Sequence, residues 1–215
     1  MPIDDVREVA YRHQCSSLRE EGGSVEDGNE KSDRSETASS TPDAVGVLIE
    51  TELGSIEVEL RPRQAPVTVE NFLEYVDGGW YDGGRFHRTV HPRNQPDDAI
   101  LIEVIQGGVN QERADLPQAP IALERTTETG LSHVDGAISM ARFAPDSALS
   151  DFFICINDQP ELDFGGRRNP DAQGFAAFGR VVRGMEIARR IQASAAEAQR
   201  LTPAVGILRI RRQDD

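Results

Sequence analysis

At 215 residues, the chain is long enough for one well-buried domain with an additional segment. Its net charge of −14 argues against nucleic-acid binding, because phosphate recognition needs clustered lysine and arginine side chains. No apolar run approaches the ~18 residues of a membrane-spanning helix, and residues 1–17 lack the apolar centre of a secretory signal. We therefore expect a cytoplasmic protein, or a periplasmic one if an export signal lies upstream, with no nucleic-acid or membrane partner.

Residues 1–44 form a segment with a composition of its own. Eleven acidic and five basic side chains give it a net charge of −6, and residues 20–42 almost lack apolar side chains. Such a composition cannot bury enough surface to offset the conformational entropy that ordering costs. We predict a disordered acidic tail, with a short helix over residues 4–14, that serves either as a solubilising linker or as a docking arm for a partner.

The pattern changes at Val45, where the folded domain, residues 45–215, is expected to begin. Strand-like residues 45–51 and 55–60 flank a short turn and predict a β-hairpin. Apolar side chains then recur at the i, i+3, i+4 and i+7 spacing of an amphipathic helix, namely at Val69, Phe72, Leu73 and Val76. Thr68 is expected to cap this helix, and the glycine pair that follows it is expected to end it.

Six further strands are predicted, over residues 85–90, 99–106, 136–141, 151–156, 176–182 and 205–211. A second helix is expected from Met185 to Ala193. Eight strands and two helices suggest an antiparallel sheet closed on itself, because closure removes exposed strand edges. The pattern alone allows either a β-barrel or a β-sandwich. Cys15 lies in the polar tail and Cys155 in an apolar strand, so both are expected to be free thiols.

Six short motifs follow one another along the folded domain. They are Phe86-His87-Arg88, Gln106-Gly107-Gly108, Ser139-Met140-Ala141, Asp151-Phe152-Phe153-Ile154-Cys155, Leu162-Asp163 and Phe178-Gly179-Arg180. Together and in this order, over roughly residues 45–212, they resemble the cyclophilins, which are peptidyl-prolyl cis–trans isomerases, and the divergent bacterial branch is the most similar.

This resemblance implies a mainly β fold, a closed eight-stranded antiparallel β-barrel capped by two α-helices. It also implies an enzyme that accelerates rotation about X-Pro bonds in proline-containing polypeptides and so assists protein folding, with no cofactor and no metal. A closed barrel makes a monomer the default expectation.

Arg88 is the candidate for the catalytic side chain. Resonance holds the peptide bond planar with a barrier of ~18–20 kcal/mol, and X-Pro exchange without a catalyst takes tens to hundreds of seconds. In the twisted state the amide nitrogen regains a lone pair. A guanidinium aimed at that nitrogen stabilises the twisted form more than the planar one, which is the requirement for catalysis. The permanent charge and planar fork of arginine suit this task better than lysine.

The resemblance also assigns the binding residues. Phe153 would form the apolar wall for the proline ring, with Val104 and Leu162 as further walls, whereas its neighbour Phe152 is expected to face the core. Gln106 would exchange a hydrogen bond with the substrate backbone, and the glycines after it would allow close backbone approach. Ala141 and Arg142 would line an extended peptide through their main-chain groups.

Several positions depart from the best-known cyclophilins. Arg142 replaces a usual asparagine, and Asp151 replaces a usual glutamine, from where it is expected to pair with Arg88 or Arg142 and to contact substrate. Glu161 stands where many members carry tryptophan, so binding of the immunosuppressant cyclosporin is expected to be weak. Phe175 takes a position that is often histidine, and is expected to supply a missing apolar wall.

Two other functions are compatible with parts of the sequence. The departures at Asp151 and Arg142 motivate a proline-peptide-binding or chaperone-like module with little or no turnover. A metal hydrolase is suggested by His87 and His91, which lie close together, and by His133 further on. The segment after His91 is extended and lacks the helical context of a zinc-binding histidine pair. We therefore interpret the histidines as ordinary surface residues and expect no metal.

Overall fold

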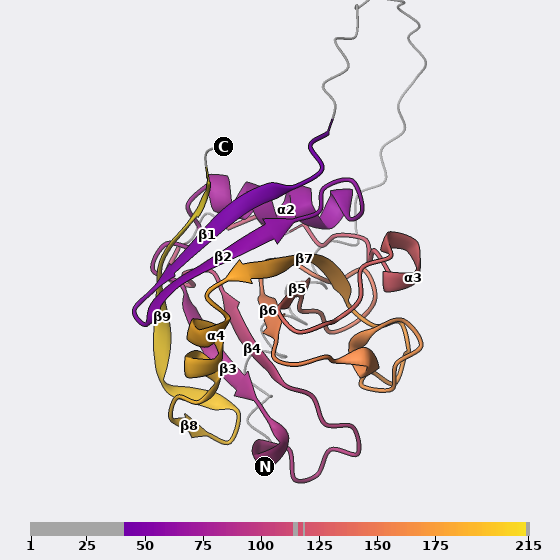
Figure 1. The fold of residues 1–215 in the computed structure, drawn as a ribbon, viewed down its shortest axis with the longest axis vertical. Coiled ribbons are helices and arrows are strands. Elements are labelled where there is room, and N and C mark those ends of the chain that lie inside the picture. The colour runs from indigo at the N-terminus through magenta and orange to yellow at the C-terminus, as the bar shows by residue number, and fades with distance from the viewer. Residues whose placement is uncertain (1–40, 114–115, 118, 214–215) are drawn as a thin grey trace, which may run out of the picture. The chain divides into compact units, whose positions relative to one another are not determined.

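The structure, a computed structural model, describes residues 41–113, 116–117 and 119–213. Its central feature is an antiparallel sheet that closes on itself (Figure 1). The strand order is β1-β2-β7-β5-β6-β4-β3-β9, and β9 pairs back with β1. The strands of this ring are β1 (Val45–Thr51), β2 (Gly54–Leu60), β3 (Arg85–Val90), β4 (Val104–Gly108), β5 (Ala137–Met140), β6 (Phe152–Cys155), β7 (Ala176–Arg183) and β9 (Arg200–Arg212).

The predicted closed, eight-stranded barrel is thereby confirmed, and the sandwich is excluded, because β1 and β9 join the two ends of the sheet. A two-residue strand, β8 (Ala196–Glu197), pairs with β9. Within the described ranges, no helix has the length and apolar character needed to span a bilayer. The predicted tail helix and Cys15 lie outside the described residues.

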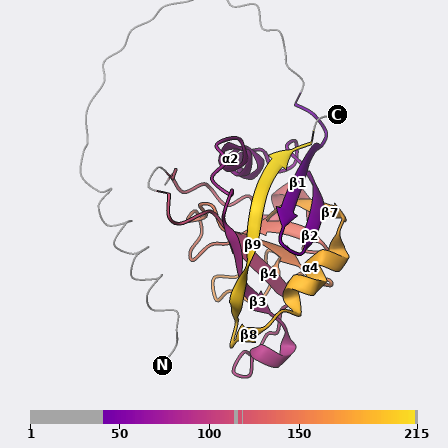
Figure 2. The same ribbon diagram turned by 90° about the vertical axis from the view of Figure 1, so that its left-hand side faces the viewer.

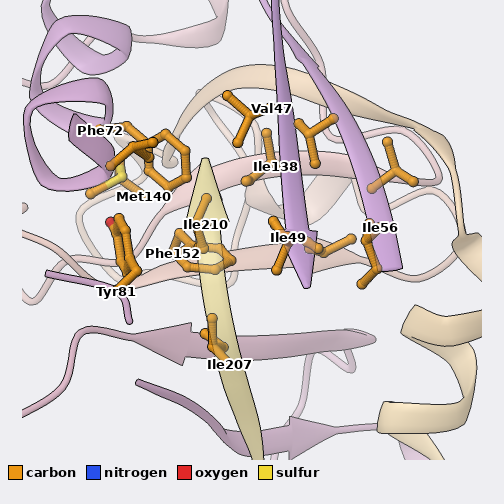
Figure 3. Packing of buried hydrophobic residues seen from close by; sticks show 14 of the residues in the cluster. Val47, Ile49, Ile56, Phe72, Tyr81, Ile138, Met140, Phe152, Ile207 and Ile210 are labelled. Carbon is orange, nitrogen blue, oxygen red and sulfur yellow. The ribbon is translucent and has the colours of Figure 1, made fainter. Parts of the chain in front are cut away.

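Alternate strand residues and aromatic rings fill the barrel interior (Figure 3). Across the β1–β2 hairpin, Val47 faces Val58 and Ile49 faces Ile56, and all four side chains are buried. Phe72 packs against three rings, with centroid separations of 5.2, 5.6 and 5.1 Å to Tyr81, Phe152 and Phe178. This closely packed interior fixes the strands whose opposite faces carry the candidate site.

Both predicted helices are present. Helix α2 (Pro66–Asp77) buries Val69 and Phe72 in the core, and helix α4 (Met185–Gln192) buries Ala188 and Ile191 there. In Figure 2, α2 lies at the top of the barrel and α4 at its lower right. The apolar side of each helix therefore contributes to the same interior that the strands enclose.

Thr68 does not cap helix α2, contrary to the prediction. The helix begins two residues earlier, at Pro66, whose fixed backbone angle and missing N–H suit a first helical position. The backbone N–H groups of Val67 and Thr68 donate to the two carboxylate oxygens of Glu124, at 3.1 and 2.8 Å. The helix is thus capped by an acid 56 positions further along the chain, at the helix end that favours negative charge.

Strand β4 begins at Val104, later than the predicted residue 99. Before it, the chain forms a short 3-10 helix, η1 (Pro92–Asn94), and a loop held by the buried side chain of Gln95. That amide donates to the Ile102 carbonyl at 2.8 Å and accepts from the Ile102 N–H at 3.2 Å. The backbone of Ile102 therefore bonds to a side chain, where a strand would bond to its neighbour. Besides η1, the elements that were not predicted are α3 (Thr126–Thr129), η2 (Pro160–Leu162) and β8.

Candidate functional site

A second, smaller apolar cluster lies on the outer face of the sheet. We call it the outer cluster; its residues are Val90, Ile102, Val104, Ala137, Phe153, Cys155 and Leu162, with Ala141 and Phe175 packed at its edge. Strand alternation explains it, because successive side chains point to opposite faces. Phe152 and Ile154 point into the core, whereas Phe153 points outward into the cluster.

Aromatic rings form one wall of the outer cluster. Phe153 and Phe175 meet edge to face with centroids 5.3 Å apart. The His133 ring stacks on Phe153 at 5.9 Å with 14° between the planes. The predicted aromatic wall residues are therefore brought together, and a histidine joins them.

His133 is buried, and the interpretation of it as a surface residue was wrong. Its exposed fraction is 1%. Its Nδ1 lies 2.7 Å from Asp163 Oδ1, and its Nε2 lies 3.0 Å from Ser139 Oγ. Both ring nitrogens thus have partners, as a buried imidazole requires. Asp163 and Ser139 both belong to motifs noted in the sequence, but nothing in the sequence links His133 to either of them.

A β-bulge in β3 sets the direction of Arg88. Phe86 pairs with Gly107 and Arg88 pairs with Gln106, so His87 is an extra residue opposite the β4 backbone. In a regular strand Phe86 and Arg88 would share a face. Because of the bulge, Phe86 enters the core, while the side chain of Arg88 meets that of Gln106 on the outer face.

Two glutamines hold the Arg88 guanidinium. Its Nη1 donates to Gln106 Oε1 at 3.1 Å, and its Nε and Nη2 donate to Gln199 Oε1 at 2.9 and 2.6 Å. Gln199 lies in the turn between β8 and β9 and is not among the predicted site residues. No motif marks this glutamine, since only the pairing of β9 with β3 brings it beside Arg88.

Asp151 pairs with neither Arg88 nor Arg142, contrary to the prediction. Its Oδ2 accepts from the Gln106 amide at 3.1 Å and lies 3.4 Å from His87 Nε2. The bulge explains this contact, because it shifts His87 out of the regular alternation. A side chain at Gly108 would place its Cβ 2.1 Å from Asp151 Oδ1, so the glycine permits this close approach.

The side chain of Arg142 extends to the loop before β7. It is 1% exposed, although the residue as a whole is only half-buried, so its exposed part is the main chain. Its Nε donates to the Gly174 carbonyl at 2.7 Å, and its two terminal nitrogens donate to Asp171 at 2.7 and 2.9 Å. Hydrogen bonding to Arg142 lowers the pKa of Asp171.

Charge at the rim of the outer cluster is paired. Glu161, next to Leu162, forms an ion pair with Arg167 at 2.6 Å, and the hydrogen bonds from Arg167 lower the pKa of Glu161. Among the described residues, no group of three or more histidine, cysteine or acidic side chains is arranged to hold a metal ion. The polar groups described at the cluster are thus the His133 imidazole, the Arg88 guanidinium, the Gln106 amide and the carboxylates of Asp151 and Glu161.

Residues 46–212 match the family model of the cyclophilin type peptidyl-prolyl cis-trans isomerases. Peptidyl-prolyl cis-trans isomerase A of Dickeya dadantii is 38% identical over 146 residues, which cover 67% of this chain and 70% of that protein. Peptidyl-prolyl cis-trans isomerase B of Escherichia coli is 31% identical over 147 residues, covering 68% and 83%.

The fold has counterparts among solved structures. A cyclophilin type isomerase of Cryptosporidium parvum superposes with a TM-score of 0.65 at 22% identity, covering 80% of this chain and 99% of that one. A further structure of it, in the presence of the dipeptide Ala-Pro, gives a TM-score of 0.64. At this identity the likeness concerns the barrel and its topology.

Proposed function

Since this chain belongs to the cyclophilin-type peptidyl-prolyl cis–trans isomerases, we propose that its reaction takes place over the outer cluster. In this proposal Phe153 is the wall for the proline ring, with Val104, Leu162 and Phe175 around it. Arg88 is the catalytic cation. The observation that carries the proposal is the position of the Arg88 guanidinium, hydrogen-bonded to Gln106 on the outer face of the strand whose Val104 enters the cluster.

The proline ring gains binding energy from the apolar surface. Burying one CH₂ group contributes about 0.8 kcal/mol, so the three ring methylenes contribute about 2 kcal/mol together. Phe153 and Val104 come from adjacent strands, since β4 pairs with β6. The paired strands therefore hold this wall rigidly. Because the wall is rigid, the proline ring stays in place while the X-Pro peptide bond rotates.

Arg88 supplies the electrostatic part of catalysis. As the X-Pro bond twists, the amide nitrogen loses conjugation and gains a lone pair, to which a guanidinium N–H donates. Gln106 and Gln199 are neutral, so these two contacts orient the guanidinium without neutralising it. A donor that is already oriented needs no reorganisation in the transition state, and this preorganisation lowers the barrier.

The peptide on either side of the proline follows the exposed main chain at Ala141 and Arg142. The Ala141 N–H donates to the Asp151 carbonyl at 2.8 Å, which keeps the chain extended beyond the end of β5. The main chain of Arg142 is exposed while its side chain is buried elsewhere. This arrangement suits hydrogen bonding to an extended peptide, as in strand addition. Asp151, which accepts a hydrogen bond from Gln106, would then also contact the substrate.

We further propose that residues 45–215 form the isomerase domain, separate from the acidic tail of residues 1–44. The enzyme would act as a monomer in the cytoplasm, or in the periplasm after export, without a nucleic-acid or membrane partner. Weak cyclosporin binding follows from Glu161, because a large apolar ligand would have to desolvate the charged pair that Glu161 forms with Arg167.

A protease-coupled assay on an Ala-Pro peptide tests the role of Arg88. We expect Arg88→Ala to lower kcat/KM about 10²–10³-fold, the usual effect of removing one transition-state donor. Arg209→Ala, at an arginine whose side chain is 52% exposed and pairs with Glu50 on β1, is the matched control and should retain full activity. If Arg88→Ala were as fast as wild type, the assignment of Arg88 would be wrong. If both proteins bound the peptide without turnover, the protein would be a proline-binding module.

A further inference from the structure

A buried arginine joins the end of β5 to the loop before β7. Arg142 donates three hydrogen bonds into this loop, two to the carboxylate of Asp171 and one to the carbonyl of Gly174. Its side chain is 1% exposed, whereas that of Asp171 is 30% exposed. Burying a guanidinium is costly unless it is paired and hydrogen-bonded, and here the bidentate carboxylate and the carbonyl meet that need.

The residue that follows this anchor is Phe175. The Arg142 guanidinium carbon lies 5.1 Å from the centroid of the Phe175 ring, within the range of a cation–π contact. The Phe175 N–H donates to the Leu162 carbonyl at 3.0 Å. Gly174 has a positive φ of 67°, and a Cβ there would lie 2.5 Å from the backbone of Asp163, so the chain is tightly fitted at this point. Phe175 is therefore fixed by three contacts: its own N–H is hydrogen-bonded, the carbonyl of the preceding residue Gly174 is hydrogen-bonded, and the Arg142 guanidinium lies over its ring.

We propose that Arg142 is a positioning residue that acts through Phe175: by gripping Asp171 and Gly174, it sets the ring of Phe175 against Phe153 and thereby fixes the width of the proline-binding surface. The inference rests on the proposed function of the outer cluster. In this role the Arg142 guanidinium makes its hydrogen bonds to Asp171 and Gly174, and it does not contact the substrate. Only the main chain of Arg142 faces the peptide.

This role makes a distinct kinetic prediction. A surface of fixed width binds the proline ring equally in the planar and twisted states, so its loss should raise KM and leave kcat nearly unchanged. We expect Arg142→Gln and Asp171→Asn each to raise KM about tenfold for an Ala-Pro substrate, with kcat within about twofold of wild type. The double variant should match the single variants, because either change breaks the same contact.

The double variant is also less prone to misfold than a single variant that leaves one charge unpaired. Asp171→Asn alone leaves a buried cation without its partner, whereas Arg142→Gln with Asp171→Asn removes both charges. Thermal unfolding establishes that each variant is folded before its kinetics are read. Arg209→Gln is the matched control: it removes an arginine that is paired with an acid, Glu50 on β1, and its KM should equal that of wild type.

Other outcomes would overturn the proposal. The proposal is wrong if KM is unchanged in the folded double variant, or if only kcat falls. It is also wrong if the increases in KM of the two single variants multiply in the double variant. Titration with the Ala-Pro peptide separates this inference from the proposed function. If wild type bound the peptide without turnover, the isomerase mechanism would fail, yet a tenfold weaker Kd in the double variant would still support the role of Arg142. An unchanged Kd would reject it.

Discussion

At the scale of single residues, the proposed mechanism depends on the orientation of the Arg88 guanidinium. Gln199 accepts from two of the Arg88 nitrogens through one oxygen, and Gln106 accepts from a third. Three bonds in the plane of the fork fix both its position and its tilt. We therefore expect Gln199 to affect catalysis through Arg88, without a contact of its own to the substrate.

Gln199→Ala tests this positioning. We expect kcat to fall by roughly 10- to 100-fold, because a small misplacement of a catalytic group has effects of that size, while KM stays close to that of wild type. The measurement is kcat and KM in the coupled assay on an Ala-Pro peptide. Gln64→Ala removes an exposed glutamine whose amide donates to the Thr129 carbonyl at 3.5 Å, and serves as the control. A Gln199→Ala enzyme with normal kcat would contradict the role.

The sequence predicted some of these residues and not others, for a physical reason. Arg88, Gln106 and Phe153 lie in motifs on neighbouring strands, and strand pairing brings such residues together. Gln199 lies in a turn and His133 in an irregular loop, and the partners of both are decided by which segments pack together in the folded barrel. The pairing of Asp151 was also mispredicted, because the bulge at His87 cannot be read from an alternating pattern.

At the scale of elements, helix α2 shows how a distant loop completes a local structure. Its first N–H groups have no partner within the helix, and Glu124 supplies both acceptor oxygens. The apolar spacing correctly predicted the body of the helix, since periodicity reports the buried face. It did not predict the cap, because Glu124 becomes a neighbour of the helix only after folding.

Glu124→Gln measures the contribution of this cap. Losing the negative charge at the positive end of the helix should lower the free energy of unfolding by about 0.5–1 kcal/mol, and Glu124→Ala should lower it by about 1–2 kcal/mol, because both acceptors are lost. Urea unfolding monitored by circular dichroism gives both values. Glu70→Gln, which makes the same charge change on an exposed residue within α2, is the control. Equal midpoints for the Glu124 and Glu70 variants would show that the cap contributes nothing.

At the scale of the whole molecule, folding buries groups that ionise in the unfolded chain. Tyr81 donates its hydroxyl proton to the Ser150 carbonyl at 2.7 Å, and burial, as the largest cause, raises the pKa of Tyr81 well above its ordinary value. Burial likewise raises the pKa of the Cys155 thiol, in the outer cluster. Both groups stay neutral in the folded barrel at a pH where the unfolded chain has already released their protons.

The barrel should therefore lose stability in alkali in two steps. Folded-state pKa values above the unfolded ones mean that stability is complete below the unfolded pKa and declines as pH rises beyond it. The decline should begin near pH ~8.5 for Cys155 and near pH ~10 for Tyr81, with a slope of up to about 1.4 kcal/mol per pH unit for each group. Urea unfolding at pH 7, 9, 10 and 11 measures it. Cys155→Ala should flatten the first step alone, and Tyr81→Phe the second alone, although the lost hydrogen bond lowers stability at every pH. If both variants kept the wild-type slope, burial of these two groups could not be its cause.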